Sequence, residues 1–128
     1  IGIALGTSMG GSSGVLLAIF FAGAGEASAA GADWPAALRA GLERMTAAGG
    51  AGPGDRTMID ALAPALAALD DGLDVAARAA RAGADATSKI TRAKAGRATY
   101  VAARSLAGHN DPGAEAVALL LEGLSGAA

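Results

Sequence analysis

The sequence has no cysteine and only one histidine among its 128 residues. The lack of cysteine excludes disulfides, thiolate metal sites and cysteine nucleophiles, and one histidine cannot form a multi-histidine metal site. Ten basic and 12 acidic residues give a net charge of -2, so the chain has no general attraction for nucleic acid or an anionic membrane. We therefore expect any anion site to be local, with no nucleic-acid or membrane partner.

Aromatic residues are scarce, at 3%, and alternating β-branched runs are nearly absent. Alanine is abundant instead, with 37 copies, and favours helices that pack closely through small side chains. The chain length fits one domain with a buried core. We predict a single all-α domain over residues 1–128.

A hydrophobic run long enough to span a membrane is also missing. The uninterrupted apolar segment Val15 to Ala22 is far shorter than the ~20 residues required, and no basic segment precedes it as in a secretory signal. We expect a buried helix in a cytoplasmic protein. Because Ile1 opens in the middle of an apolar, glycine-punctuated pattern, we also expect further residues of the functional unit upstream.

Turn residues and apolar spacing divide the chain into six expected helices. Asp33, with Pro35 in the first turn, caps the second helix, and Asp55 caps the third, in which Pro64 predicts a kink. The short connections favour antiparallel neighbours in an up-and-down bundle. The expected helices span about 14–25, 33–49, 55–69, 75–89, 95–106 and 113–124. Their inward residues are Leu38, Leu42, Met45; Met58, Leu62, Leu66, Leu69; Val75, Ala79, Ala82, Ala86; and Val117, Leu120, Leu121, Leu124.

The turn Met9–Gly14 runs directly into the first helix and contains three glycines and two serines. Unpaired N–H groups and the macrodipole at a helix N-terminus favour an anion such as phosphate. Similar turns also serve only as N-caps or allow close packing.

Three further junctions carry unusual residues: Gly49 to Met58, Gly96-Arg97, and Asp111-Pro112-Gly113. Arg97 belongs to a basic run that is by default a solvated face, yet its guanidinium can form bidentate bonds to phosphate.

In this order, MGGSSG before an apolar helix, GPGDRTMIDAL, AGRATY and DPGA resemble the nucleotide-binding domain of the dihydroxyacetone kinases. The same domain forms the L subunit of the phosphotransferase-system versions. The similarity extends over nearly the whole chain. It implies an antiparallel barrel of eight helices, of which about six would lie in this chain, with the nucleotide held by loops at one end.

The resemblance assigns roles around ATP or ADP. Ser12 and Ser13 with the glycine amides would hold the phosphates, and Arg97 would contact the charged part of the nucleotide. Gly49 and Met58 would border the adenine, although methionine at this spacing is usually a core residue. The loop Asp111-Pro112-Gly113 would close over the base and the ribose. The implied nucleotide-binding residues are Gly10, Gly11, Ser12, Ser13, Gly49, Met58, Arg97, Asp111, Pro112 and Gly113.

Members of that family bind two magnesium ions through an aspartate-rich loop ahead of the glycine-serine turn. No acidic residue precedes Glu26 here, and the cluster Asp70, Asp71 and Asp74 does not match that loop. We expect the metal ligands upstream of Ile1, and no metal ligand or catalytic residue in this chain. His109 is expected to be a turn residue, because the histidine that binds the ketone lies on a separate domain or subunit in the family.

The leading hypothesis is therefore the ATP/ADP-binding domain of a dihydroxyacetone-type kinase. It would support Mg²⁺-dependent phosphoryl transfer to a small hydroxyketone on a substrate-binding domain or subunit, while this fragment alone would be inactive. One alternative is the phosphotransferase-system L subunit, with ADP as a bound cofactor. Another is a non-enzymatic helical module that binds a ligand or partner. We expect upstream residues or a homodimer to cover the apolar faces of Val15 to Phe21.

Overall fold

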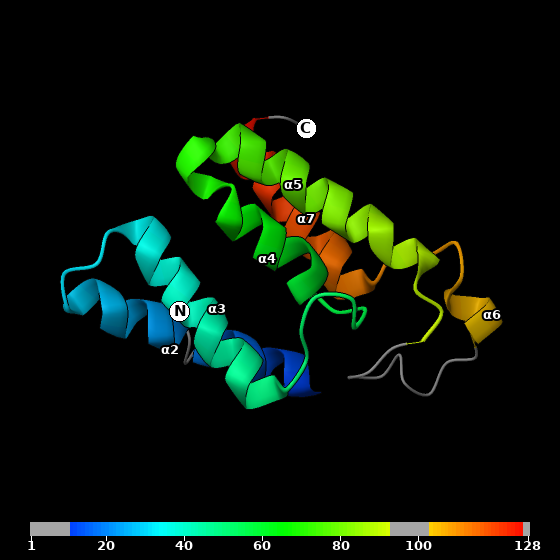
Figure 1. Ribbon diagram of the computed structural model, residues 1–128, viewed down its shortest axis with the longest axis horizontal. Helices are drawn as coiled ribbons and strands as arrows, with labels where there is room; N and C mark the ends of the chain where they lie inside the picture. The colour runs from blue at the N-terminus through cyan, green and yellow to red at the C-terminus, as the bar shows by residue number, and fades with distance from the viewer. Residues whose placement is uncertain (1–10, 93–102, 127–128) are drawn as a thin grey trace. The chain divides into compact units, whose positions relative to one another are not determined.

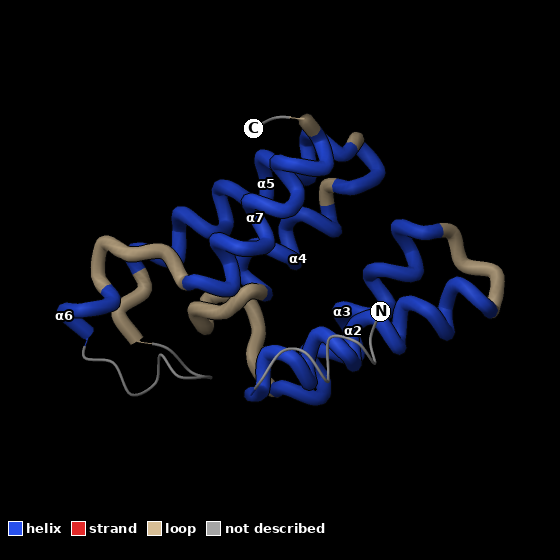
Figure 2. The backbone as a smooth tube through the Cα atoms, turned by 180° about the vertical axis from the view of Figure 1, so that it is seen from behind, coloured by secondary structure: helices blue, strands red, loops and turns tan. Residues whose placement is uncertain are grey.

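A computed structural model of the protein describes residues 11–92 and 103–126, and these residues form helices joined by loops without any strand (Figure 2). The all-α prediction is confirmed. The chain divides into two compact units, residues 1–50 and residues 51–128, which are described separately. The assignment of the whole chain to one domain stays a prediction.

The first unit is a hairpin of two helices that lie side by side, α2 (Gly11–Ala29) and α3 (Trp34–Gly49) (Figure 1). Asp33 caps α3 as predicted, since its side chain accepts a hydrogen bond from the Ala36 N–H at 3.0 Å. Gly50, at φ 71°, ends the helix in the left-handed conformation. The predicted ends of α3 are confirmed, whereas α2 is longer than the predicted 14–25.

Small residues let the two helices of the hairpin approach closely. A Cβ atom on Gly41 would lie 2.3 Å from the carbonyl oxygen of Phe20, so this contact requires glycine. Phe20 and Met45 are buried, and Glu26 forms an ion pair with Arg44. By length and composition alone α2 could cross a membrane, because Ser12–Ala29 has a mean hydropathy of 1.3. That is weak evidence, since a core helix passes the same test.

The second unit is built on three helices, α4 (Ile59–Ala67), α5 (Leu73–Ala86) and α7 (Pro112–Ser125), which pack against one another (Figure 1). Two 3₁₀ turns, η1 (Leu69–Asp71) and η2 (Thr87–Lys89), flank α5. The short helix α6 (Ala103–Leu106) is the described part of the predicted fifth helix. The fully buried positions of the core are mostly alanine: Ala61, Ala65, Ala76, Ala77, Ala80, Ala84, Ala114 and Ala118.

The predicted inward face of α5 is wrong. Val75 and Ala79 are half-buried and Ala82 and Ala86 are exposed, while Ala76, Ala77, Ala80 and Ala84 are buried. The charged residues Asp74, Arg78, Arg81 and Asp85 recur at i, i+4, i+7 and i+11 and mark the polar side of this helix, a signal that the prediction did not use. The face away from this stripe packs on α4 and α7.

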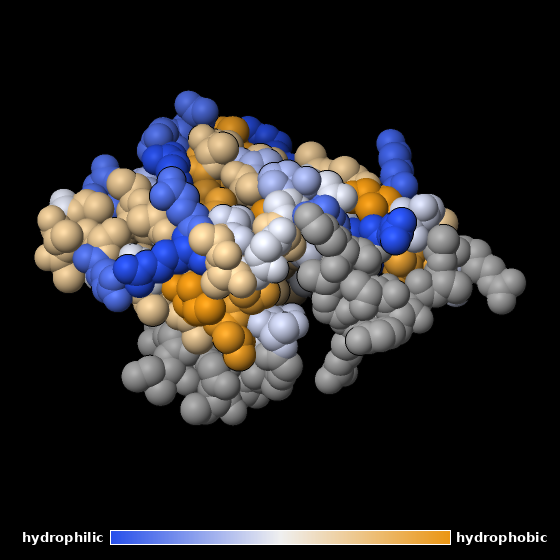
Figure 3. All heavy atoms as spheres, turned by 60° about the horizontal axis from the view of Figure 1, so that its bottom comes forward, coloured by the Kyte–Doolittle hydropathy of each residue, from blue (hydrophilic) through white to orange (hydrophobic). Residues whose placement is uncertain are grey.

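The inward face predicted for α7 is also partly wrong. Leu120 and Leu124 are each 63% exposed, whereas Ala114 and Ala118 are fully buried, because α7 meets its neighbours through small residues. Val117 and Leu121 are half-buried. Figure 3 shows hydrophobic residues at the surface among hydrophilic ones. The exposed large apolar residues are Val15, Trp34, Leu119, Leu120 and Leu124.

The contact between α4 and α5 depends on Pro64 and Gly83. Pro64 lies inside α4 and has no N–H, so it cannot donate to the carbonyl of Asp60, four residues earlier. Gly83 of α5 lies against this carbonyl, and a Cβ atom there would be only 2.0 Å from the Asp60 oxygen. The missing side chain of Gly83 therefore sets how closely α5 approaches α4.

Candidate functional site

The predicted phosphate-binding turn lies at the beginning of α2. Gly10 is outside the described residues, Gly11 is the first residue of the helix, and Ser12 and Ser13 are exposed in its first turn. The first N–H groups of a helix have no partner within it, and no acidic side chain occupies this turn. These donors suit an anion. Gly49 belongs to the same unit, where a Cβ atom on it would lie 2.9 Å from Cδ2 of Leu16 in α2.

The loop before α4 is held by its own aspartates. The predicted Asp55 cap is wrong: its carboxylate accepts from the Gly52 N–H at 2.8 Å, and α4 begins after Met58 without a side-chain cap. Asp60, inside the first turn, accepts instead from the Thr57 N–H at 2.8 Å and from the Gly54 N–H. A carboxylate there also favours the helix N-terminus electrostatically.

Arg56 lies in this loop with its side chain buried, only 2% exposed. Its Nε donates to the Ile90 carbonyl at 3.1 Å, and its Nη2 donates to the carbonyls of His109 at 2.6 Å and Leu106 at 3.4 Å. Its Nη1 lies 3.7 Å from Asp111 Oδ1. The sequence does not predict these contacts, because no local pattern points to partners 34 to 53 residues away.

Asp111 caps α7 and is itself largely buried. Its Oδ2 accepts from the Ala114 N–H at 2.9 Å, and its own N–H donates to Thr87 Oγ1 at 2.7 Å. Thr87, fully buried, in turn donates to the Ala84 carbonyl at 2.6 Å. Burial raises the pKa of Asp111, while the Ala114 N–H and the Arg56 charge act to lower it. The carboxylate thus fixes the start of α7.

The structure brings Met58 and the start of α7 together. A Cβ atom on Gly113 would lie 3.2 Å from Met58 Cβ, 3.4 Å from Met58 N and 3.1 Å from Asp111 Oδ2. Met58 is half-buried rather than enclosed in the core, and Pro112 is exposed. Three residues predicted to border a base, Met58, Asp111 and Gly113, therefore lie side by side.

Two other predicted residues differ in status. Arg97 lies outside the described residues. His109 is exposed in the turn before α7, where its backbone carbonyl accepts from Arg56.

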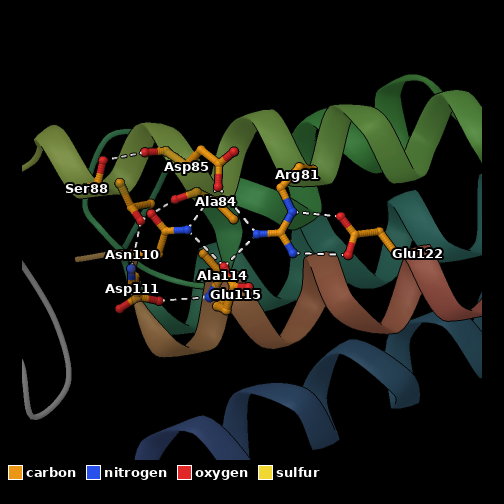
Figure 4. Close-up of polar contacts among 10 residues, drawn as sticks. Arg81, Ala84, Asp85, Ser88, Asn110, Asp111, Ala114, Glu115 and Glu122 are labelled. Carbon is orange, nitrogen blue, oxygen red and sulfur yellow. Dashed lines mark hydrogen bonds and ion pairs between the residues drawn. The ribbon is translucent and has the colours of Figure 1, made fainter. Parts of the chain in front are cut away.

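A cluster of charged and amide groups joins α5 to α7 beside this turn (Figure 4). The Arg81 guanidinium forms a fork to Glu122, with Nε–Oε1 at 2.7 Å and Nη2–Oε2 at 3.1 Å, and its Nη1 donates to Glu115 Oε2 at 2.7 Å. Asn110, next to Asp111, donates to Glu115 at 2.9 Å and to Asp85 at 3.0 Å. Hydrogen bonds from Arg81 lower the pKa of Glu122 and of Glu115, the latter also through Asn110.

This cluster predicts a loss of stability in acid. Because the folded-state pKa values of Glu115 and Glu122 lie below the unfolded value of about 4.3, their contribution is present above that pH and is lost as the pH falls through the folded values. From pH 5 to pH 3, the free energy of unfolding in urea should fall more for the wild type than for Arg81→Met. The pKa of Asp111 is raised, so its contribution to stability changes with pH in the opposite direction. Asp111 is present in both proteins, so this contribution does not distinguish them.

The control is Arg78→Met, which removes an exposed i,i+4 pair with Asp74. This variant should follow the wild-type pH dependence. Equal losses for the wild type and Arg81→Met would show that the cluster contributes nothing to acid sensitivity.

Among the described residues, no three or more His, Cys, Asp or Glu side chains are grouped so that they could hold a metal ion. The acidic residues Asp70, Asp71 and Asp74 flank the start of α5 and are exposed. The residues that the structure describes thus do not provide a magnesium site of the kind that phosphoryl transfer uses.

Comparison with known proteins gives a consistent result. The DAK2 domain model matches residues 1–126. The dihydroxyacetone kinase of Citrobacter freundii is 48% identical over 128 residues, which cover 98% of this chain and 23% of the kinase. The L-erythrulose 1-kinase of Mycolicibacterium smegmatis is 39% identical over 136 residues, covering 96% of this chain and 24% of that enzyme. The chain thus spans about a quarter of the length of these kinases.

A shorter relative is the ADP-binding subunit DhaL of the PEP-dependent dihydroxyacetone kinase of Escherichia coli, 34% identical over 99% of this chain and 67% of the subunit. The native crystal structure of the C. freundii kinase has a TM-score of 0.84 and 44% identity, covering 99% of this chain and 22% of that one. The structure of that kinase with AMP-PNP and Mg²⁺ has a TM-score of 0.80 and 42% identity, with the same coverage. These matches confirm the resemblance predicted from the four motifs.

Proposed function

Because this chain belongs to the DAK2 domain family, we propose that it is the ATP/ADP-binding domain of a dihydroxyacetone-type kinase. The observation that carries this proposal is the contact between Gly113 and Met58, 55 positions apart in the chain, beside the capping Asp111. These residues belong to the two motifs assigned to the base. Two relatives, an ADP-binding subunit and a kinase whose structure was solved with AMP-PNP and Mg²⁺, support the same ligand.

The chain's own residues would act by positioning and by charge stabilisation. Met58 and Gly113 would border the base, and Pro112 would lie over it and the ribose. In the first unit, Ser12, Ser13 and the N–H groups that begin α2 would hold phosphate oxygens. Arg97 would add a bidentate contact to phosphate. None of these groups forms or breaks a bond itself, and we propose that the acceptor is held by another domain or subunit.

Magnesium supplies charge neutralisation and alignment of the phosphates in such reactions. The described residues do not fit this ion, so we propose that its ligands lie outside this chain. We also propose a cytoplasmic protein that works with a substrate-binding domain or subunit, and in which upstream residues or a second copy cover apolar surface such as Val15.

The test is an assay of the protein that carries this chain, together with any residues that precede or follow it and its substrate-binding partner. With Mg²⁺, ATP and dihydroxyacetone, we expect ADP to form only when the ketone is present. Arg97→Ala should lower the apparent affinity for nucleotide by about tenfold, which corresponds to the loss of a charge-assisted contact. Lack of any nucleotide binding would favour the non-enzymatic module instead.

A second candidate within the family is the phosphotransferase-system form, in which ADP is a retained cofactor. The similarity to the ADP-binding DhaL subunit, which the chain covers to 67%, favours this reading. Native mass spectrometry distinguishes the two. Co-purifying ADP, together with activity that requires a protein phosphodonor rather than added ATP, would identify this second form.

A further inference from the structure

We propose that Arg56 is a positioning residue for the base of the nucleotide, an inference that rests on the proposed function. Its side chain fastens the loop 52–58 to the segment that leads into α7. Arg56 lies two residues before Met58, and its acceptor His109 lies two residues before Asp111. One guanidinium thus fixes the backbone beside both groups that would contact the base.

The contacts of Arg56 are directional and converge on backbone. Three carbonyls accept from Nε and Nη2: that of Ile90, after η2, and those of Leu106, which ends α6, and His109, in the turn between α6 and α7. The only carboxylate paired with Arg56 among the described residues belongs to Asp111, at 3.7 Å, which is an ion-pair distance rather than a hydrogen bond. A planar fork with five donors can hold several carbonyls in fixed directions, which an ammonium group cannot do.

The backbone at Arg56 supports a specific role. Its φ of 60° lies in the left-handed region, and Arg56 is the only non-glycine residue with positive φ in the parts of the chain that the structure describes. This conformation costs free energy for any residue with a Cβ atom. Glycine would adopt it without that cost, and Gly50, Gly52 and Gly54 occur just before Arg56 in the chain. The contacts of the side chain therefore have to offset the strain.

The arrangement also explains how the Met58–Gly113 contact is kept. Gly113 is held by the Asp111 cap, and Asp111 is held by Thr87 and approached by Arg56. Met58 is carried by the loop that Arg56 anchors. Without the guanidinium, the loop 52–58 and the turn 109–113 lose their direct connection through His109, so the two walls of the base site can shift apart.

The experiment compares two variants at Arg56 in the whole protein. Arg56→Gly removes the side chain and also the backbone strain, whereas Arg56→Lys keeps a positive charge but not the fork. The control is Leu69→Ala, a buried position in η1, which follows the C-terminal end of α4 and belongs to neither loop. Calorimetry gives the ADP affinity at a temperature at which circular dichroism shows every variant to be folded.

We expect Arg56→Gly to weaken ADP binding by about tenfold or more, and Arg56→Lys to restore only part of it. Leu69→Ala should lower the melting temperature yet bind ADP like the wild type. In the kinase assay, KM for ATP should rise in Arg56→Gly with little change in kcat, because the contact acts on binding in the ground state and transition state alike.

Wild-type affinity in Arg56→Gly would overturn the positioning role and leave the proposed function standing. If Arg56→Gly does not fold, Arg56→Lys decides the question: wild-type affinity in that variant overturns the role, and a weaker affinity at unchanged secondary structure supports it. Absence of ADP binding by the wild type would instead overturn the proposed function together with this inference.

Discussion

Replacing Gly83 by valine is expected to unfold the second unit at temperatures at which the wild type is folded. A Cβ atom on Gly83 would lie 2.0 Å from the Asp60 carbonyl oxygen, 3.0 Å from the Asp60 carbonyl carbon and 3.1 Å from Ala61 Cα. All three atoms belong to backbone, so no side-chain rotation can relieve the clash. Overpacking of flexible side chains already costs about 1–3 kcal/mol, and we expect at least about 3 kcal/mol here.

The measurement is urea unfolding followed by circular dichroism. Gly123→Ala is the matched control, because Gly123 lies inside α7 with no atom within 4 Å of its would-be Cβ. That variant should gain up to about 1 kcal/mol from helix propensity. A Gly83→Val protein within about 1 kcal/mol of the wild type, a change typical of an uncrowded site, would show that α5 does not approach α4 as closely as described.

Replacing Gly113 by valine is expected to abolish most nucleotide binding while leaving the fold largely intact. The added atoms would meet Met58 Cβ at 3.2 Å and Asp111 Oδ2 at 3.1 Å, where a base is proposed to lie. Met58 Cβ and Met58 N, the latter at 3.4 Å, are fixed to the backbone, so the loop must shift by a few tenths of an ångström, a smaller displacement than the one that Gly83→Val requires. We expect the ADP dissociation constant to rise by about a hundredfold, equivalent to about 2.7 kcal/mol.

Ala116→Val provides the control for this variant. It adds the same β-branched side chain to α7 at an exposed position, so it should reduce helix propensity slightly and leave ADP affinity unchanged. Equal affinities for Gly113→Val and the wild type would place the base elsewhere. Equal losses in both variants would assign the effect to α7 as a whole.

Local chemistry explains which parts of the fold the sequence could predict. Asp33, Pro35 and the Gly49-Gly50 pair determine the ends of α3 through their own backbone preferences, and they act as predicted. Asp55 and Asp60 show the limit of this reasoning. Both lie near the start of α4 and both can accept from backbone N–H groups, and the choice between them depends on the shape of the whole loop.

Packing between helices was harder to predict, because the fully buried positions are mostly alanine and differ little in character from exposed alanines. On α5 the prediction followed alanines at helical spacing through Ala79 and Ala82, whereas the charged residues Asp74, Arg78, Arg81 and Asp85 share one face and favour burial of the opposite one, around Ala76 and Ala80. On α7 the prediction assigned the leucines to the buried face, whereas the buried residues are Ala114 and Ala118. Glycine at position 83 and proline at position 64 explain the close approach only once the two helices are seen together.

The candidate site shows the same division. Its motifs identify the family, because four ordered patterns of unusual residues are far more specific than any single glycine turn. The proposed role of Arg56 could not be predicted from these motifs, because it depends on hydrogen bonds to backbone carbonyls. Every residue has such a carbonyl, so the sequence does not indicate which of them will accept.

The most direct test of the central claim is a calorimetric titration of ADP, with Mg²⁺, into the wild-type protein that carries this chain and any residues that precede or follow it. We expect saturable binding of one ADP per chain, which GDP does not reproduce at the same affinity, and which weakens in Gly113→Val. A protein that is folded by circular dichroism, free of retained nucleotide by mass spectrometry and yet unable to bind ADP would contradict the assignment of an adenine nucleotide site.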